Sequence, residues 1–433
     1  MKISSGKDIR IISGIMAAAM LLGGCTSVQD DGTRRGKDTP KPKTEIKLNE
    51  VSTTEYDKEL MDELYRNYCF DIFSQTVKDF GGEENIMISP ASIMMALDMV
   101  SAGAKGDSLK QLTDLFAKGQ GPLTQQAYAA ALMDRINGAE RVEFSCANAV
   151  WSNKSILGDK VNSEYVDYIQ DTFNAEYNVQ KFGKKTADEI NSWVDKHTDH
   201  MIKKVIDDLD PSTVMVLVNA IAFDAKWSTP YEEYQVREGE FRKWDGSTQN
   251  VDFLNGTEYR YFETEKAIGF TKGYEGGEYS FLVILPTDES VSANEFVKSF
   301  TAEDYEKFIG SVSLEYEVIT SMPAFESDFE FLLNDTIANL GAPDVFDYTT
   351  ADLSGIAGNP GDLYVSKVIH KTHIEVDANG TKAAAVTSVS LSAGSAMPEE
   401  KMFRYVNCDR PFVYAIVENT TMAPVFIGTV NEV

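Results

Sequence analysis

The chain has 433 residues, of which 40 are lysine or arginine and 68 are aspartate or glutamate, giving a formal net charge of −28. This length provides material for one large domain or two ordinary ones with a substantial core. The acidic balance argues against nucleic-acid binding, because phosphates favour basic surfaces, and it predicts a soluble, strongly solvated exterior.

The first 24 residues are typical of a secretion signal. Basic residues precede an apolar run over residues 11–24, which is too short to span a bilayer core of ~30 Å. The run ends in LGGC at residues 22–25, which resembles a bacterial lipobox; the alternative is a plain signal peptide followed by a chance cysteine. We therefore expect an exported bacterial lipoprotein, lipidated on Cys25 and held at the outer membrane, on the cell surface or facing the periplasm. Its only membrane contact is expected to be this lipid.

Residues 25–55 are polar and charged and lack any apolar period, which predicts a disordered tether. One folded domain is expected over residues 56–433. Its three cysteines are too dispersed for a disulfide framework, and we expect them to be small buried apolar side chains.

The folded part begins with a predicted helix over residues 56–79, where apolar side chains recur at helical spacing. A second amphipathic helix is predicted over residues 188–209. Residues 214–223 are almost continuously apolar, which is typical of a strand covered on both faces. Helices dominate the first half and strands the second, which favours an α+β fold with large mixed or antiparallel sheets. The further predicted strands cover residues 279–285, 316–321, 363–376, 412–417 and 425–430.

The sequence lacks the common motifs of catalysis and cofactor binding, including GxSxG, the P-loop, GxGxxG and HExxH. His370 and His373 are three apart on a predicted strand, so they point to opposite faces and cannot chelate one ion. His197 and His200 could share a helical face, but no third strong ligand is evident. We therefore expect neither a metal nor another cofactor.

The stretch from Gly380 to Pro398 combines the composition of a loop with the pattern of a strand. It contains no aromatic residue, no proline before residue 398 and a single charge, on Lys382. At strand period one face is small to apolar and the other mostly polar or small, as alternation across a pleat requires. A flexible Ala/Ser/Thr linker or an alanine-favoured helix are the alternatives. A segment suited to both a loop and a central strand indicates a conformational switch.

Several blocks distributed over residues 56–433 resemble the serpin family in their order and spacing. Each block alone is weak evidence of kinship, whereas together they are specific. They are NIMISPASI at 85–93, VNAIAF at 218–223 with KW at 226–227, LGAPDVF at 340–346, ADLSGI at 351–356, SKVIHKTHIEV at 366–376, RPF at 410–412 and FIG at 426–428.

The resemblance implies an α+β domain of three β-sheets and eight or nine helices with an exposed reactive-centre loop. It implies a metastable protease inhibitor rather than an enzyme. In this family the protease attacks the loop as bait, and the acylated loop inserts into the main sheet. Insertion drags the protease across the molecule and deforms its active site before deacylation.

The resemblance also assigns roles by position. The polar cluster under the main sheet where the strands part, which we call the shutter, is expected at Ser89, Ser92, Asn219 and His370. Ordinary capping and core hydrogen bonding would explain the same residue types. Trp227 matches the aromatic at the breach, where insertion begins. The hinge of the loop is expected at Gly380, Thr381, Ala383, Ala384, Ala385 and Val386.

Fourteen residues counted from Thr381 place the cleaved bond at Gly394–Ser395, and a change in loop length would leave Ala396–Met397 or Leu391–Ser392 as alternatives. Every candidate is small or apolar, which favours elastase-like or subtilisin-like serine proteases over trypsin-like ones, with cysteine proteases as a further class. The inhibitor is expected to act as a monomer.

Two hinge positions depart from the family, which usually carries glutamate where Ala378 and Lys382 stand. Loss of an exposed ion pair is worth about 0–1 kcal/mol, so we expect it to tune rather than abolish switching.

Two other functions compete with inhibition. A non-inhibitory serpin-fold binding or scaffold protein is the main alternative, and the alanine run at residues 383–385 argues against it, because such members often carry charged or bulky hinge residues. A hydrolase using Ser89 or Ser395 with His370 is disfavoured, because no oxyanion-type glycine motif accompanies either serine.

Overall fold

The apolar periodicity at the start of the domain forms a long helix, α1 (Lys58–Phe80), close to the one predicted over residues 56–79. The structure, a computed structural model, describes residues 46–158, 161–381 and 402–433. Asp57 caps α1 by accepting a hydrogen bond from the Leu60 amide. In the described ranges no helix has both the length and the apolar character needed to cross a membrane.

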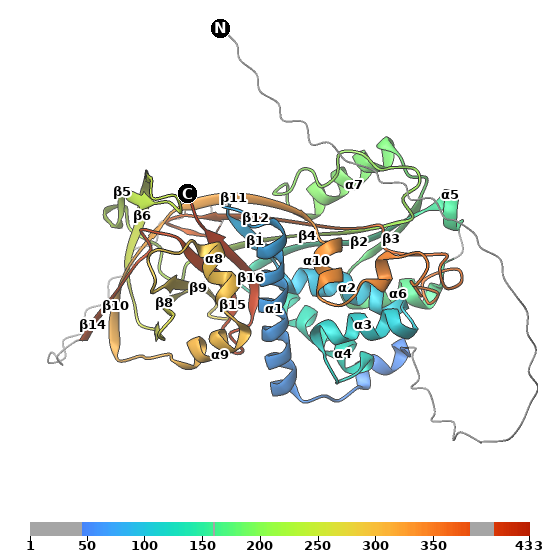
Figure 1. Ribbon diagram of the computed structural model, residues 1–433, viewed down its shortest axis with the longest axis horizontal. Coiled ribbons are helices and arrows are strands. Elements are labelled where there is room, and N and C mark those ends of the chain that lie inside the picture. The colour runs from blue at the N-terminus through green and yellow to red at the C-terminus, as the bar shows by residue number, and fades with distance from the viewer. Residues whose placement is uncertain (1–45, 159–160, 382–401) are drawn as a thin grey trace, which may run out of the picture. The chain divides into compact units, whose positions relative to one another are not determined.

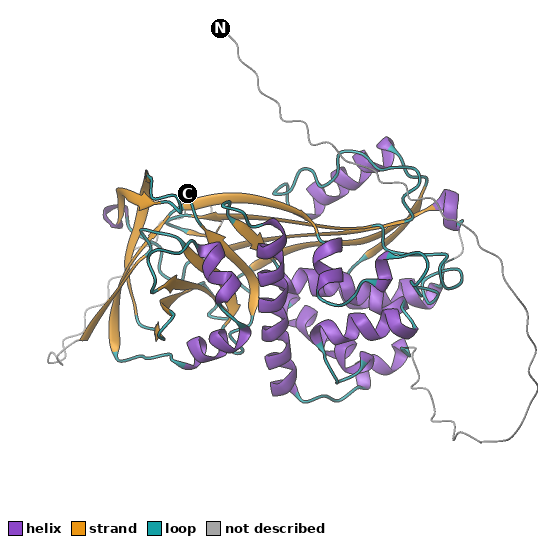
Figure 2. Cartoon of the chain, viewed as in Figure 1, coloured by secondary structure: helices purple, strands orange, loops and turns teal. Residues whose placement is uncertain are grey.

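Most of the other helices lie in the first half of the chain, as expected (Figures 1 and 2). Ten α-helices occur among the described residues, and nine remain without the four-residue α5, in line with the expected eight or nine. Helix α2 is buried along its whole length. The helices after α1 are α2 (Pro90–Gly103), α3 (Gly106–Phe116), α4 (Pro122–Asn137), α5 (Lys154–Leu157), α6 (Ser163–Phe173), α7 (Lys184–His197), α8 (Ala293–Ser299), α9 (Ala302–Gly310) and α10 (Asn334–Asn339), with 3₁₀ segments at η1 (Leu48–Thr53), η2 (Glu233–Gln235) and η3 (Asp344–Phe346).

The predicted helix over residues 188–209 is wrong in its second half, because α7 ends at His197. Asp199 and His200 adopt positive φ angles of 47° and 62°, which end the helix. Beyond them the side chain of Asn191 accepts hydrogen bonds from the amides of residues 205 and 206 and so stabilises an irregular segment. The apolar side chains that suggested helix are nevertheless buried, because they pack under this segment.

The strands form three sheets, and every strand predicted from the sequence is confirmed with small shifts of its ends. Sheet A, the main sheet, contains in spatial order β11 (Phe325–Leu332), β12 (Lys367–Val376), β13 (Gly380–Thr381), β4 (Met215–Lys226), β2 (Glu143–Asn153) and β3 (Glu176–Gln180). Sheet B contains β1 (Ile86–Ile88), β16 (Pro424–Val430), β15 (Phe412–Glu418), β9 (Tyr279–Pro286), β8 (Ala267–Gly273) and β7 (Tyr261–Glu263). Sheet C contains β14 (Met402–Asn407), β10 (Tyr316–Pro323), β6 (Thr248–Glu258) and β5 (Val236–Arg242).

The middle of sheet A contains a junction between two parallel strands, β12 and β4, which we call the slot. The strands pair directly from Lys367 opposite Val216 to His373 opposite Ala222. Beyond that point the two-residue strand β13 lies between them, with Thr381 opposite Val376 on one side and Ala225 on the other. The slot is therefore closed along most of its length and already occupied at one end.

Helices cover both faces of sheet A around the slot (Figure 1). Because side chains alternate along a strand, Val216, Val218 and Ala220 of β4 face α7, with which they form a separate hydrophobic cluster. Asn219 points to the opposite face, where α2 begins. This alternation positions a polar side chain under the slot.

Candidate functional site

The predicted shutter residues Ser89, Ser92, Asn219 and His370 are buried and connected by hydrogen bonds. Ser89 is the N-cap of α2, and its Oγ accepts a hydrogen bond from the Ser92 amide at 3.3 Å. The same hydroxyl donates to the carbonyl oxygen of Val425 at 2.8 Å, which ties the helix start to sheet B. The Ser89 amide donates to Nε2 of His370 at 3.0 Å, which ties it to β12.

Asn219 is the centre of the shutter, since all four of its side-chain hydrogen-bonding positions are used. Its Oδ1 accepts from Nδ1 of His370 at 2.9 Å and from the hydroxyl of Ser92. Its Nδ2 donates to the Ser92 carbonyl oxygen at 2.9 Å and to Oδ1 of Asn148 at 2.8 Å. His370, Asn219 and Asn148 stand directly opposite one another on β12, β4 and β2. The bond between His370 and Asn219 therefore crosses the slot.

Asn148 is a member of the shutter that the sequence analysis missed. It is buried in the middle of β2, where an amide side chain requires a partner. A polar residue inside an otherwise covered strand is a usable signal, but its partner depends on strand register, which the sequence does not specify.

The shutter histidine is neutral. Burial lowers the pKa of His370 from 6.5 to about 3. Its Nε2 accepts a hydrogen bond from the Ser89 amide, so the proton of the neutral ring lies on Nδ1 and is donated to Asn219. Ser89 Oγ makes no hydrogen bond to this imidazole, so the pair does not have the nucleophile–base arrangement of a hydrolase.

Gly380 and Thr381, the first hinge residues, form β13 at the end of the slot where β12 and β4 no longer pair directly. A Cβ added to Gly380 would lie 2.1 Å from the carbonyl oxygen of Ala225, so only glycine fits this close backbone approach. Thr381 is fully buried, and its hydroxyl is hydrogen-bonded to the hydroxyl of Tyr274 at 2.6 Å. Tyr274 lies on the connection after β8 and was not predicted as part of the site.

Trp227 lies next to β13, as predicted for the breach. Its ring is buried and stacks on Tyr274 with a centroid separation of 4.6 Å, and its Nε1 donates to the carbonyl oxygen of Asp377 at 2.9 Å. The backbone amides of Trp227 and Tyr231 donate to the carbonyl oxygens of Asn379 and Ala378 at 2.9 and 2.8 Å. Residues 377–379, which lead into the hinge, are thus held by the segment 227–231.

That segment is held in turn by a buried lysine. Nζ of Lys272 donates to the carbonyl oxygen of Thr229 at 3.0 Å, pairs with Oε1 of Glu258 at 3.1 Å and lies 4.2 Å from the ring centroid of Tyr231. Burial raises the pKa of Glu258, and the charge of Lys272 opposes that rise. Lys272 is on sheet B and Glu258 on sheet C, so nothing in their sequence spacing indicated the pair. The pair supports the breach in this chain, which has alanine rather than glutamate at position 378.

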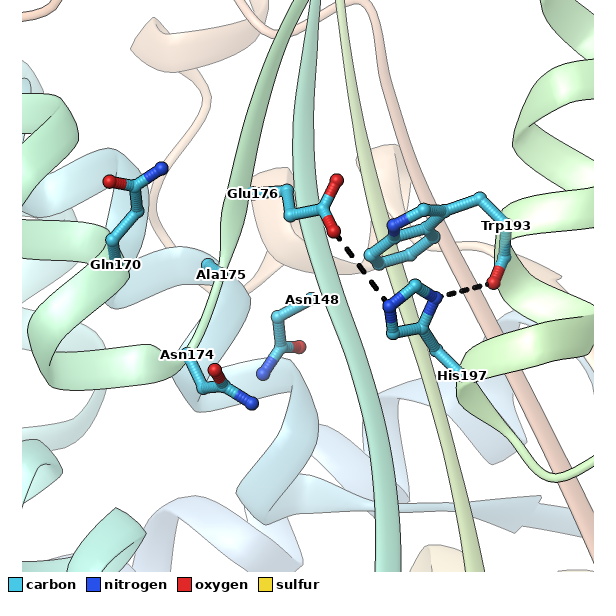
Figure 3. A pocket seen from close by; sticks show the side chains of 7 residues that line it. All are labelled: Asn148, Gln170, Asn174, Ala175, Glu176, Trp193 and His197. Atoms are coloured by element: carbon cyan, nitrogen blue, oxygen red, sulfur yellow. Dashed lines mark hydrogen bonds and ion pairs between the residues drawn. The ribbon is translucent and has the colours of Figure 1, made fainter.

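A cavity of about 290 Å³ opens near the shutter, between the start of β3 and α7 (Figure 3). Asn148 lines it together with Glu176 and His197, whose Nε2 lies 3.7 Å from Oε1 of that glutamate. His200 instead contacts Asp195, so the two histidines do not converge on one site. The described residues contain no group of three or more His, Cys, Asp or Glu side chains that could hold a metal ion.

Several predicted site residues lie outside the described residues, so their roles remain predictions. They are Cys25, Ala383, Ala384, Ala385, Val386, Leu391, Gly394, Ser395 and Ala396. Of the remaining cysteines, Cys69 and Cys408 are buried free thiols, as expected, and the side chain of Cys146 is also outside the described set.

Residues 63–433 match the model of the family Serpin (serine protease inhibitor). The chain is 35% identical over 362 residues to Iripin-5 of Ixodes ricinus, covering 81% of this chain and 89% of that protein. It is 29% identical over 375 residues to leukocyte elastase inhibitor A of Mus musculus, covering 84% and 97% of the two chains. Among solved structures, the native state of the thermophilic serpin tengpin matches with a TM-score of 0.79 and 35% identity, covering 88% of this chain and 96% of that one.

The chain therefore belongs to the serpin family, and its fold is the serpin fold. Most members of this family are protease inhibitors and some are not, so membership argues against an enzyme and leaves the particular activity to be proposed.

Acid is expected to destabilise the protein through His370. The folded-state pKa of about 3 lies below the ordinary 6.5, so the unfolded chain takes up the proton first and stability falls as the pH drops from 6.5 toward 3. Between pH 7 and pH 5 this histidine alone should cost about 2 kcal/mol. In urea unfolding, the stability gap between the wild type and His370→Gln should shrink by that amount over this interval. A constant gap for His370→Gln would contradict a neutral shutter histidine.

Removing the charge of Lys272 should destabilise the breach. Lys272→Met keeps the length of the side chain but leaves Glu258 buried without its cation, so we expect a loss of about 3 kcal/mol in urea unfolding. The double variant Lys272→Met/Glu258→Gln should recover most of it. Lys266→Met breaks an exposed pair with Asp304 and should cost no more than about 1 kcal/mol. Equal losses for Lys272→Met and Lys266→Met would mean that the buried ion pair stabilises the protein no more than the exposed one.

Proposed function

We propose that this protein is an inhibitory serpin that traps elastase-like or subtilisin-like serine proteases as a covalent acyl complex. The observation that carries the proposal is the partly filled slot, in which Gly380 and Thr381 already pair with β4 and β12 at the end where the loop begins. A loop freed by cleavage needs only to continue this pairing along β4. Apart from Lys382, the residues that follow Thr381 up to Ser390 are small or β-branched, which fits such a passage.

The reaction begins as ordinary proteolysis. The hydroxyl of the catalytic serine of the protease attacks the carbonyl carbon of Gly394, the peptide bond to Ser395 breaks, and the amine of Ser395 leaves with a proton. An ester now joins the protease to Gly394. Insertion of the freed segment then carries the protease away before water hydrolyses this ester.

Insertion has a defined cost at the shutter. A new strand between β12 and β4 replaces their direct pairing and separates His370 from Asn219, whose hydrogen bond crosses the slot. Each backbone hydrogen bond lost between the two strands is replaced by bonds from both strands to the new one. Because His370 is neutral, breaking its bond to Asn219 separates no charges.

The choice of target rests on the loop and on one relative. The candidate bonds lie between small or apolar residues, which suit the narrow pockets of elastase-like and subtilisin-like enzymes. Among its relatives is a leukocyte elastase inhibitor, whose name points to the same class. We further propose that the protein acts as a monomeric lipoprotein, tethered through Cys25. The tether expected over residues 25–55 is shorter at its C-terminal end, because residues 46–55 contain η1 and bury Ile46 and Val51 in the core. The remaining residues 25–45 give a flexible chain a reach of about 25 Å.

Incubation with pancreatic elastase or subtilisin tests the proposal. We expect a band stable in SDS at the summed mass of the inhibitor and the protease, and a melting temperature of the cleaved form well above that of the intact form. Loop cleavage without such a band, and without a rise in melting temperature, would instead support a non-inhibitory serpin-fold binding protein.

Thr381→Arg should convert the inhibitor into a substrate. The threonine side chain is fully buried beside Tyr274, and a guanidinium there would enter the slot without a counter-charge. The partition between covalent complex and cleaved inhibitor, measured on SDS gels, should shift almost entirely to cleavage. Thr248→Arg is the matched control, because it makes the same change at the exposed start of β6, away from the slot, and should keep trapping. Undiminished trapping by Thr381→Arg would contradict the hinge assignment.

A further inference from the structure

Half of the exposed large apolar side chains of the described chain gather at sheet C. Six of twelve lie on β14, directly after β6 or on the turn that enters β10. Tyr234 and Trp244 flank β5 at the other edge of the sheet, and the remaining four are scattered. Isolated apolar side chains are normal on a protein surface, but a contiguous group marks a binding surface. The six are Tyr259, Val312, Leu314, Met402, Phe403 and Tyr405.

Three of these rings share one face of sheet C. Phe403 and Tyr405 alternate along β14 with Arg404, whose guanidinium points to the other face, 4.0 Å from the ring centroid of Tyr316. Phe403 stands opposite Glu317 of β10. Tyr259 directly follows the partner of Val318 at the end of β6 and so flanks Glu317 from the other side. We call Tyr259, Phe403 and Tyr405 the sheet-C patch.

The patch is built on paired strands rather than on a loop. β14 pairs with β10 along six residues, and β10 pairs on its other side with β6 (Figure 1). The opposite face of these strands packs against the core, since Val318 on that face is completely buried. The three rings are 46–64% exposed and are nevertheless held in fixed relative positions, which lowers the entropy cost of binding a partner.

The patch starts where the reactive loop rejoins the described chain. Ser395 of the predicted bond precedes Met402 by seven residues (402 − 395), so an extended chain separates them by at most about 25 Å. A protease domain of about 220 residues has a radius of gyration of about 17 Å. A protease seated on Gly394–Ser395 therefore extends over the space beside β14.

We propose that the sheet-C patch is a second docking surface for the protease that attacks the loop. This inference rests on the proposed inhibitory function and adds a contact outside the loop. The three rings are aromatic and exposed, so the complementary surface on the protease is apolar. The patch acts before acylation by prolonging the encounter complex, and it has no part in inserting the loop.

The test compares association with trapping. In the double variant Phe403→Ala/Tyr405→Ala, the second-order rate constant for inhibition of pancreatic elastase should fall about tenfold, as expected for the loss of an interface anchor. The number of inhibitor molecules consumed per trapped protease should not change. Tyr259→Ala, on a different strand, should lower the same rate constant severalfold and guards against a folding defect confined to β14. Tyr348→Ala removes an equally exposed ring, 66% against 64% for Tyr405, away from sheet C and should leave the rate unchanged.

Each outcome bears on one proposal or the other. Unchanged rates in both patch variants with elastase and with subtilisin would overturn the docking surface while leaving inhibition intact. If wild-type loop is cleaved without a covalent complex, inhibition fails, but a tenfold slower cleavage of the patch variants would still support docking. If neither protease cleaves the loop, the target class and the docking surface proposed for it both fall. A further outcome is that sedimentation shows a wild-type dimer that is absent in the patch variants, with no change in the rate constant for inhibition. In that case a second copy of the chain occupies the patch and the proposal is wrong.

Discussion

The structure depends on the direct pairing of β12 with β4 in the middle of sheet A. Two parallel strands that meet without an intervening strand leave a position that only another extended segment can occupy. The chain supplies the first two residues of that segment as β13, and their fit requires the absence of a side chain at Gly380. The slot is therefore a continuous junction of the sheet along its middle and is filled by β13 only at one end.

Two hydrogen-bonded assemblies control opposite parts of the slot. The shutter closes its middle through neutral groups, with Asn219 joining β4 to β12, β2 and α2. The breach lies at the end of the slot that β13 occupies. There Glu258 pairs with Lys272, Lys272 donates to the segment 227–231, and this segment holds residues 377–379. Separating β12 from β4 at the shutter breaks only hydrogen bonds between neutral groups. The breach instead contains a buried ion pair, whose disruption is costly. This contrast fits the proposed insertion, in which the strands part at the shutter while the segment that holds residues 377–379 stays in place.

Features that depend on local sequence were predicted, whereas features that depend on contacts between distant segments were not. The strand at β4 follows from its continuous apolar run, so the sequence was enough to predict it. Capping by Ser89, which was given as the ordinary alternative to a shutter role, is also found. The helix predicted beyond His197 failed because its apolar side chains are buried by tertiary packing rather than by helical periodicity. Tyr274, Asn148 and Lys272 were missed, since each acts on a partner from a distant strand. The resemblance to the family grouped four residues that the structure joins by hydrogen bonds, and their role as a shutter stays a prediction. The resemblance carried no information on side chains particular to this chain.

By itself, the sequence determined the strand pattern, the charge balance and the small, proline-free composition of the loop, because these depend on residue type and spacing alone. It also determined the family, through blocks whose order and spacing are specific. Only the tertiary structure decided that Gly380 and Thr381 already enter the slot, that His370 is neutral, and that exposed rings share one face of sheet C. Those properties arise from strand register and burial, which bring together residues that lie far apart along the chain.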